Sequence, residues 1–212
     1  MVDFIFSKVY HDSRPMSKAG FYLLISTLIF TSLNILVKYV AHVPTSQVVF
    51  LRSIVSVALC LIALQHMKIS PWGNNKKLLI VLGFIGTLSV FCMFYALAHM
   101  PIAMAMTFSN LSPLFTVMIA HFVLHERVHP LHVFFLLAAF GGVLLVKGWD
   151  TSVSWSLAAV GIMTAAFASC AYTSVRVLKE TDHAMVVVFY FPLISVPMMA
   201  IPAAKEWVPL TT

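Results

Sequence analysis

One short segment has the residue types and spacing of a zinc protease. His125-Glu126-Arg127-Val128-His129 fits H-E-x-x-H, in which two histidines on one helix face bind zinc and the glutamate is the general base. Pro130 follows at once, so we predict the end of an apolar span and a short loop rather than a helix interior. A third ligand is also needed, and the later apolar segments contain no acidic residue. We expect no metal site, and intramembrane zinc proteolysis is the less favoured alternative.

Three polar residues lie inside or at the edge of apolar segments. A charge in a bilayer costs about 2.5–3.5 kcal/mol on insertion scales, so Arg52 needs a reason to lie about 10 Å inside its segment. The alternatives are snorkelling or a structural ion pair, and contact with a substrate carboxylate or phosphate. Lys38 is shallower, where snorkelling is expected. Asn34 lies one turn earlier on the same helical face, and together they are predicted to edge an external vestibule.

The stretch Phe94–Arg127 contains an apolar run with Pro113 at its centre. Pro113 removes one backbone hydrogen bond and frees the carbonyl of Ser109. Kinks of this kind are tolerated in membrane spans where neighbours or water satisfy the freed carbonyl. The polar side chains around the proline are Thr107, Ser109, Asn110 and Ser112. We therefore predict that Thr107, Asn110 and Pro113 line a cavity, with a purely structural kink as the alternative.

The elements that position these residues follow from composition. The chain of 212 residues is 61% hydrophobic and only 9% charged, whereas soluble domains carry about 25% charged residues. This places the chain in the membrane class, and its net charge of +6 is attributed to cytoplasmic loops rather than to nucleic-acid binding. Cys60, Cys92 and Cys170 fall in apolar runs and are interpreted as packing residues.

A membrane span needs about 20 apolar residues. The apolar segments that fit are 20–40, 46–66, 78–98, 101–124, 131–148, 155–178 and 184–204. The predicted fold is thus an all-α membrane protein, a multi-span helical bundle. The first of these segments is too long for a signal-peptide core, so we interpret it as a retained span after a cytoplasmic N-terminal segment, 1–19.

Orientation is predicted from the distribution of Lys and Arg between the loops. One side holds Lys8, Arg14, Lys18, Lys68, Lys76, Lys77, Arg127, Arg176 and Lys179. The other side holds only Lys147 and Lys205. The richer side is expected to be cytoplasmic, which places the N-terminus inside the cell. The expected location is an inner (cell) membrane of bacterial type.

A faint internal repeat connects the two halves. Asn34–Lys38 aligns with Tyr172–Arg176, and Val48–Phe50 falls one residue away from alignment with Val187–Phe189. Because a repeat of five spans is odd, its second copy must be inverted, and inverted repeats are typical of secondary transporters. The small residues Gly161, Ala165, Ser169 and Thr173 recur every fourth residue and predict a close helix-packing seam.

These patterns resemble the drug/metabolite transporter superfamily, in particular its EamA-type carriers. The resemblance rests on Phe94–Leu97, Met100-Pro-Ile-Ala, Ser112–Thr116 and Leu124-x-Glu126-Arg127, in order and spacing, with weaker matches elsewhere. The weaker matches are Asn34 with Lys38, Arg52, Gly141-Gly142, and Gly161 with Tyr172 and Arg176. The resemblance implies two inverted five-span repeats around a central pathway, alternating access and no cofactor.

On this basis residues 20–148 are predicted to form a complete first repeat and 155–212 the first two spans of the second. The family usually has ten spans, so the expectation is a truncated transporter that needs its missing C-terminal spans or a homodimer partner. We predict a carrier and not an enzyme, without catalytic residues, for small metabolites of the amino acid, amine, nucleotide-like or carboxylate class. The predicted pathway residues are Asn34, Lys38, Arg52, Thr107, Asn110, Pro113 and Tyr172. A seven-span receptor or sensor is the alternative.

Overall fold

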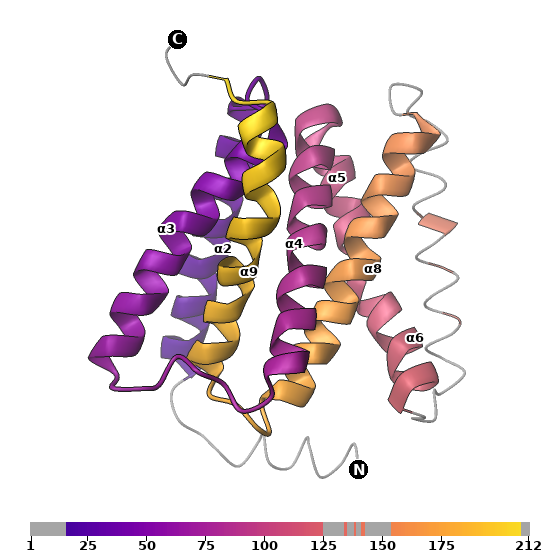
Figure 1. Ribbon diagram of the computed structural model, residues 1–212. Coiled ribbons are helices and arrows are strands. Elements are labelled where there is room, and N and C mark those ends of the chain that lie inside the picture. Colours follow the sequence, from indigo (N-terminus) through magenta and orange to yellow (C-terminus); the bar gives the residue numbers. More distant parts are fainter. Residues whose placement is uncertain (1–15, 125–133, 135–137, 139–140, 143–153, 209–212) are drawn as a thin grey trace. The chain divides into compact units, whose positions relative to one another are not determined.

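The computed structural model describes residues 16–124, 134, 138, 141–142 and 154–208, and the regular elements among them are helices (Figure 1). They are α2 (Met16–Tyr39), α3 (Thr45–His66), α4 (Lys76–His99), α5 (Ile102–Ser109), α6 (Ser112–Leu124), α8 (Trp155–Leu178) and α9 (Ala184–Lys205). The predicted span 131–148 and the H-E-x-x-H segment lie mostly outside the described residues. Elsewhere the helices follow the predicted spans closely.

Among the residues that the structure describes, five segments are long and apolar enough to cross a membrane, namely α3, α4, Ile102–Ile119, α8 and α9. In α2 the apolar part is shorter, Leu24–Tyr39. The chain divides into two compact units at Leu36, within α2, and the second unit is Val37–Thr212. The predicted class, a multi-span helical membrane protein, is confirmed.

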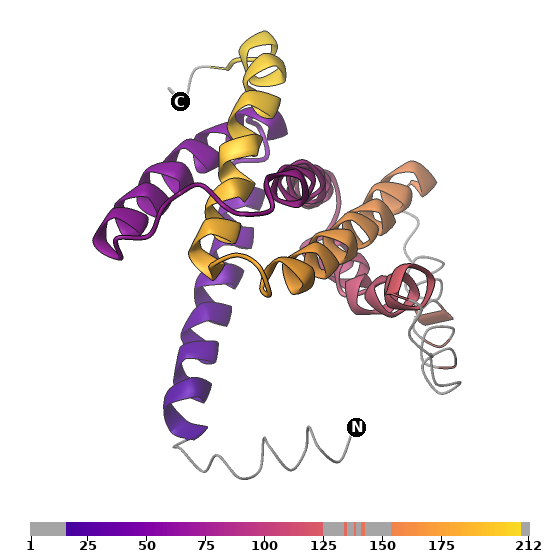
Figure 2. The same cartoon turned by 60° about the horizontal axis from the view of Figure 1, so that its bottom comes forward.

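In the second unit α4 packs against both α8 and α9, and α9 also packs against α3. Figure 2 views α4 nearly along its axis, between α9 and α8. α8 also packs against α5 and α6, and α5 contacts α4 as well. The start of α3 meets the end of α9, where Ser46 donates a hydrogen bond to Glu206 at 3.3 Å, so α3 and α9 are antiparallel.

Close packing of these helices depends on glycines. A Cβ on Gly86 would lie 2.7 Å from the Phe191 ring, and one on Gly83 would lie 2.6 Å from the Ile194 side chain. On α8, a Cβ on Gly161 would meet the Phe108 side chain at 2.7 Å. Further along the same face, Ser169 donates to Thr116 at 3.1 Å. The packing seam predicted on this face of α8 is therefore confirmed.

Three prolines, Pro192, Pro197 and Pro202, lie inside α9. Each lacks the N–H that would bond to the carbonyl four residues earlier, so α9 loses regular bonds along its length. In the middle of the α3–α9 contact the hydroxyls of Ser53 and Ser195 are hydrogen-bonded at 2.9 Å, and both side chains are buried. This pair supplies a buried polar link between α3 and α9, in addition to the Ser46–Glu206 hydrogen bond at their ends.

The structure corrects the expectation of one kinked helix around Pro113. The segment is divided into α5 and α6 by a turn at Asn110 and Leu111. Pro113 is the second residue of α6, a position where a missing N–H costs little because the first turn has no acceptor for it. The proline thus starts a helix rather than bending one.

Candidate functional site

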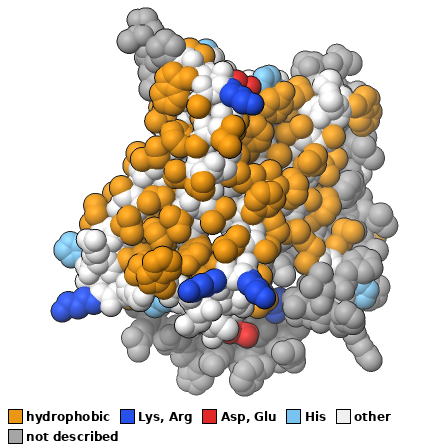
Figure 3. Space-filling model, in the orientation of Figure 1, with side chains coloured by type: hydrophobic (Ala, Val, Ile, Leu, Met, Phe, Trp, Pro, Cys, Tyr) orange, Lys and Arg blue, Asp and Glu red, His pale blue; other side chains and the backbone are white. Residues whose placement is uncertain are grey.

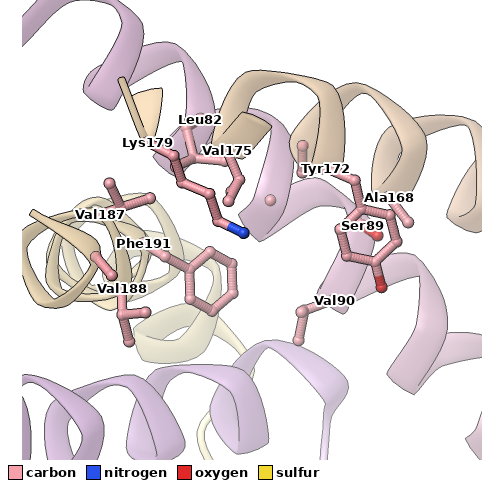
Figure 4. A pocket seen from close by; sticks show the side chains of 13 residues that line it. Leu82, Ser89, Val90, Ala168, Tyr172, Val175, Lys179, Val187, Val188 and Phe191 are labelled. Atoms are coloured by element: carbon pink, nitrogen blue, oxygen red, sulfur yellow. The ribbon is translucent and has the colours of Figure 1, made fainter. Parts of the chain in front are cut away.

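A cavity of about 350 Å³ lies between α4, α8 and α9. Its walls are mostly apolar and include the ring of Phe191 (Figure 4). The lining residues are Leu82, Gly86, Ser89, Val90, Ala168, Ala171, Tyr172, Val175, Lys179, Ala184, Val187, Val188 and Phe191. A site of this size and composition is suited to a small organic molecule.

Helical periodicity brings these residues to one place. On α8, Ala168, Tyr172, Val175 and Lys179 follow at intervals of three or four residues, so they share one face. On α9, Val187 and Val188 each lie three or four residues from both Ala184 and Phe191, so these residues also share one face. Gly86 on α4 leaves the space into which the Phe191 ring packs. The cavity is therefore where three such faces meet.

The polar groups of the cavity are few. Figure 4 shows the Lys179 ammonium pointing into the space between Phe191 and Tyr172. Lys179 is the C-cap residue of α8, where a cation is favoured by the helix dipole. Tyr172 is 60% exposed. Ser89 is buried and donates to the Thr164 carbonyl at 3.2 Å, so its hydrogen already has an acceptor.

A second cavity, of about 320 Å³, lies at the opposite end of α4 and is more polar. It is lined by Ala41, His42, Val43, Pro44, Thr45, Ser46, Phe91, Tyr95, His99 and Glu206. The rings of Tyr95 and His99 stack with centroids 4.2 Å apart, and a ring nitrogen of His99 is 2.9 Å from the Tyr95 carbonyl oxygen. Both contacts join residues one turn apart on α4.

Arg52 lies on α3, outside both cavities. Its guanidinium carbon is 5.3 Å from the centroid of the Phe94 ring, a cation–π geometry. Within the described part of the chain no carboxylate bridges it. Lys38 has a different role from snorkelling, since its ammonium donates to the carbonyls of Ala98 at 3.2 Å and Met100 at 3.0 Å. The Ala98 and Met100 carbonyls lie at the C-terminal end of α4, where carbonyls have no partner within the helix, so the Lys38 ammonium satisfies them.

The remaining predicted residues are not brought together. Thr107 donates to the Ala103 carbonyl of its own helix at 2.8 Å, and Asn110 is the exposed C-cap of α5. Asn34 lies in the first unit. Of the predicted residues it is Tyr172 that lines the larger cavity. Lys179 was missed because its charge was used only for orientation, although its seven-residue spacing from Tyr172 was visible in the sequence.

A chain of membrane-length apolar helices with a cavity between three of them is a multi-span membrane protein. The sequence model of the EamA-like transporter family matches residues 17–148. The chain belongs to this family, which confirms the resemblance to the drug/metabolite transporter superfamily.

Individual relatives agree with this assignment. The chain is 32% identical to the pseudopaline exporter CntI of Pseudomonas aeruginosa over 203 residues, which cover 90% of this chain and 71% of the exporter. It is 27% identical to human solute carrier family 35 member G1 over 192 residues, 82% of this chain and 52% of that protein. A transporter of Helicobacter pylori is 26% identical over 80% of this chain and 58% of its own length. No solved structure matches the chain.

Proposed function

We propose that this chain is a secondary-active carrier of small metabolites that exports its substrate by alternating access. The observation that carries the proposal is the place of the larger cavity. One wall, α4, lies in the segment that matches the family, and the other two, α8 and α9, lie after it. In carriers built from repeats the substrate site lies between the repeats. The direction is taken from the relative named as an exporter.

The arrangement of α3 and α9 supports the proposed inverted repeat of 20–148 and 155–212. The Val48–Phe50 triplet lies on α3 and the Val187–Phe189 triplet lies on α9. The two helices are antiparallel neighbours, joined at one end by the Ser46–Glu206 hydrogen bond. Related spans of opposite direction are what an inverted repeat requires.

We further propose that the end of the second unit that carries Lys68, Lys76, Lys77 and Lys179 faces the cytoplasm of a bacterial cell. Figure 3 shows a face covered by hydrophobic side chains, with Lys and Arg gathered mainly near one end. Cytoplasmic loops are enriched in these residues. From the distribution of Lys and Arg along the sequence we also propose that the N-terminus is inside. Reporter fusions at residues 1 and 212 test it, because an external N-terminus would reverse the assignment.

Arg52 remains a proposed anion contact, distinct from the cavity. Its position against Phe94 leaves guanidinium N–H groups without a hydrogen-bond acceptor among the described residues. Asn34, Lys38, Thr107, Asn110 and Pro113 stay in the proposal as residues of the wider pathway. Uptake or efflux by the Asn110→Ala variant tests that group, since unchanged kinetics would remove Asn110 from the pathway.

The carrier proposal is tested with the full chain in liposomes that have an imposed ion gradient. Radiolabelled amino acids, amines, nucleotide-like compounds and carboxylates are screened as substrates. Ala168→Trp fills the cavity and is expected to abolish transport of any substrate found. Ala159→Trp is the matched control, because Ala159 is an exposed residue of the same helix that does not line the cavity. Normal transport by Ala168→Trp would overturn the assignment of the cavity.

The proposal includes further helices that complete the pathway, from a second copy of this chain or from C-terminal spans. Light scattering measures the mass of the purified protein and so tests whether it is a homodimer. A monomer that transports would remove the homodimer from the proposal.

A further inference from the structure

We infer that the cavity between α4, α8 and α9 takes an amphipathic organic anion, with a carboxylate or similar group at Lys179 and an apolar body along the cavity. This inference rests on the proposed function, because only a carrier function makes the cavity a substrate site. Two features of the cavity support this inference, the charge of Lys179 and the apolar character of the walls.

Lys179 brings a positive charge that no described side chain neutralises. Its ammonium points into the cavity (Figure 4) and contacts no carboxylate within the part of the chain that the structure describes. The neighbouring acid Asp182 is already occupied, because it accepts hydrogen bonds from the backbone N–H groups of Asn74 and Asn75 and from the Thr181 hydroxyl. Glu180 is exposed and makes no ion pair with Lys179. An anionic ligand is the complement that this charge lacks.

The walls beyond Lys179 match an apolar body. Val175 on α8, Val187 and Val188 on α9, and Val90 on α4 present aliphatic side chains, and Phe191 presents an aromatic ring. Burying apolar surface against such walls contributes about 25 cal/mol for each Å² removed from water. A bare inorganic anion would gain nothing from them.

Lys179 lies at the end of α8, where a charged group of the ligand can be bound without being fully buried. It follows the last residue of α8, at the end of the unit where Lys76 and Lys77 begin α4. A carboxylate at this level stays partly hydrated while the apolar body enters the cavity, which avoids the cost of a fully buried charge. A cationic ligand would be repelled by the same ammonium.

The cavity also predicts the length of the ligand. Tyr172 and Lys179 are seven residues apart on one helix face, which is about 10 Å along the axis at 1.5 Å per residue. The Tyr172 hydroxyl makes no hydrogen bond to a described residue, so it is free to bond to a polar group at the far end of the ligand.

Binding to the full chain in detergent tests the inference with three probes of equal chain length: octanoate, octanol and octylamine. Radiolabelled octanoate is expected to bind and to be displaced far better by octanoate than by octanol or octylamine. Lys179→Gln is expected to weaken octanoate binding about tenfold, the loss of one charge-assisted hydrogen bond. Lys179→Arg should retain binding.

Lys77→Gln is the matched control, because Lys77 is an exposed lysine at the same end of the unit and does not line the cavity. It should bind octanoate as the wild type does. Equal affinity for the three probes, or unchanged binding by a folded Lys179→Gln variant, would overturn the inference. Folding of each variant is checked by its elution profile.

Two further arms separate the sources of the anion and the two proposals. If anionic phospholipid co-purifies with the wild type and is depleted in Lys179→Gln, the bound anion is a lipid headgroup. If octanoate binds and no such lipid co-purifies, the anion is a free metabolite. Both results support an amphipathic anion as the ligand. If the anion binds but is not transported, the carrier proposal fails and the assignment of the ligand stands. If Ala168→Trp blocks transport but Lys179→Gln leaves it unchanged, the anionic ligand is ruled out and the carrier proposal stands.

Discussion

Gln47 forms two hydrogen bonds with the backbone of Val208. Its Nε2 donates to the Val208 carbonyl oxygen at 2.9 Å, and its Oε1 accepts from the Val208 N–H at 3.1 Å. Gln47 is fully buried near the start of α3, while Val208 lies just beyond the end of α9. One side chain therefore satisfies both polar groups of a backbone unit in an irregular segment, and it ties this segment to α3.

Gln47→Leu is expected to destabilise the protein by about 1–3 kcal/mol, because both backbone groups of Val208 lose their partner. Gln65→Leu is the control, since Gln65 is an exposed residue at the other end of the same helix. Thermal melting in detergent compares the two variants. Equal melting temperatures would show that water replaces the side chain at Val208 without cost.

Asp182→Ala is expected to loosen the contact between the α3–α4 loop and the α8–α9 loop. Asp182 accepts from the N–H groups of Asn74 and Asn75, and Asn74 in turn donates to the Thr181 carbonyl at 2.8 Å. Hydrogen exchange at Asn74 and Asn75 should become faster than in the wild type, because their acceptor is gone.

Glu180→Ala serves as the control for this loop contact, since Glu180 is exposed. A Gly73→Ala variant should act like Asp182→Ala, because its Cβ would collide with the Leu79 side chain and the Asp182 carboxylate. If exchange at Asn74 is the same in both Asp182→Ala and Glu180→Ala, the carboxylate does not hold the loops together.

The Ser53–Ser195 pair is expected to show a coupling energy between α3 and α9. Interhelical hydrogen bonds in membranes average about 0.6 kcal/mol and reach about 1.7 kcal/mol in double-mutant cycles. Ser53→Ala, Ser195→Ala and the double variant are compared by unfolding in detergent. A coupling indistinguishable from zero would mean that Ser53 is satisfied by the Val49 carbonyl, to which it also lies close at 2.7 Å.

Pro197→Ala is expected to stabilise α9 by about 0.5–1.5 kcal/mol, because it restores an N–H donor to the Leu193 carbonyl. Pro197 is exposed, so the change leaves no buried cavity. Pro44→Ala is the control, since Pro44 is the N-cap of α3 and its replacement restores no intrahelical bond. A lower melting temperature for Pro197→Ala would show that the packing of α9 needs the broken bond.

Arg52 and Phe94 are expected to be coupled by about 0.5–2 kcal/mol, the range of cation–π contacts. Arg52→Ala, Phe94→Leu and the double variant are compared for stability and, in the liposome assay, for transport. We expect Arg52→Ala to abolish transport while Phe94→Leu reduces only stability. Unchanged transport by Arg52→Ala would end the proposed anion contact.

Sequence reasoning predicted the helices well and the site poorly. Apolar length alone placed α3, α4, α8 and α9 within a few residues of their observed ends, because a bilayer demands about 20 apolar residues in succession. Four-residue spacing of small residues predicted the seam of α8. The motifs around Pro113 and Leu124 were sufficient to predict the family.

Contacts between distant residues could not be predicted in this way. The sequence marked Arg52 and Lys38 as unusual charges, but it could not show that one lies on the Phe94 ring and the other caps α4. It also passed over the three prolines of α9 and the place of Lys179, the charged side chain among the described residues that line the cavity. A residue's type limits what it can bind, but its partner depends on which faces the packed helices turn toward one another.

What the sequence by itself determined is therefore the class of the protein, its family and the bounds of α3, α4, α8 and α9, since these depend on local composition and on motif spacing along one helix. The cavity between α4, α8 and α9 was decided only by tertiary structure. It exists because Gly83 and Gly86 allow α9 to approach α4 closely while the faces of α8 and α9 that carry Lys179 and Phe191 converge. Such convergence is a property of three helices together and of none of them alone.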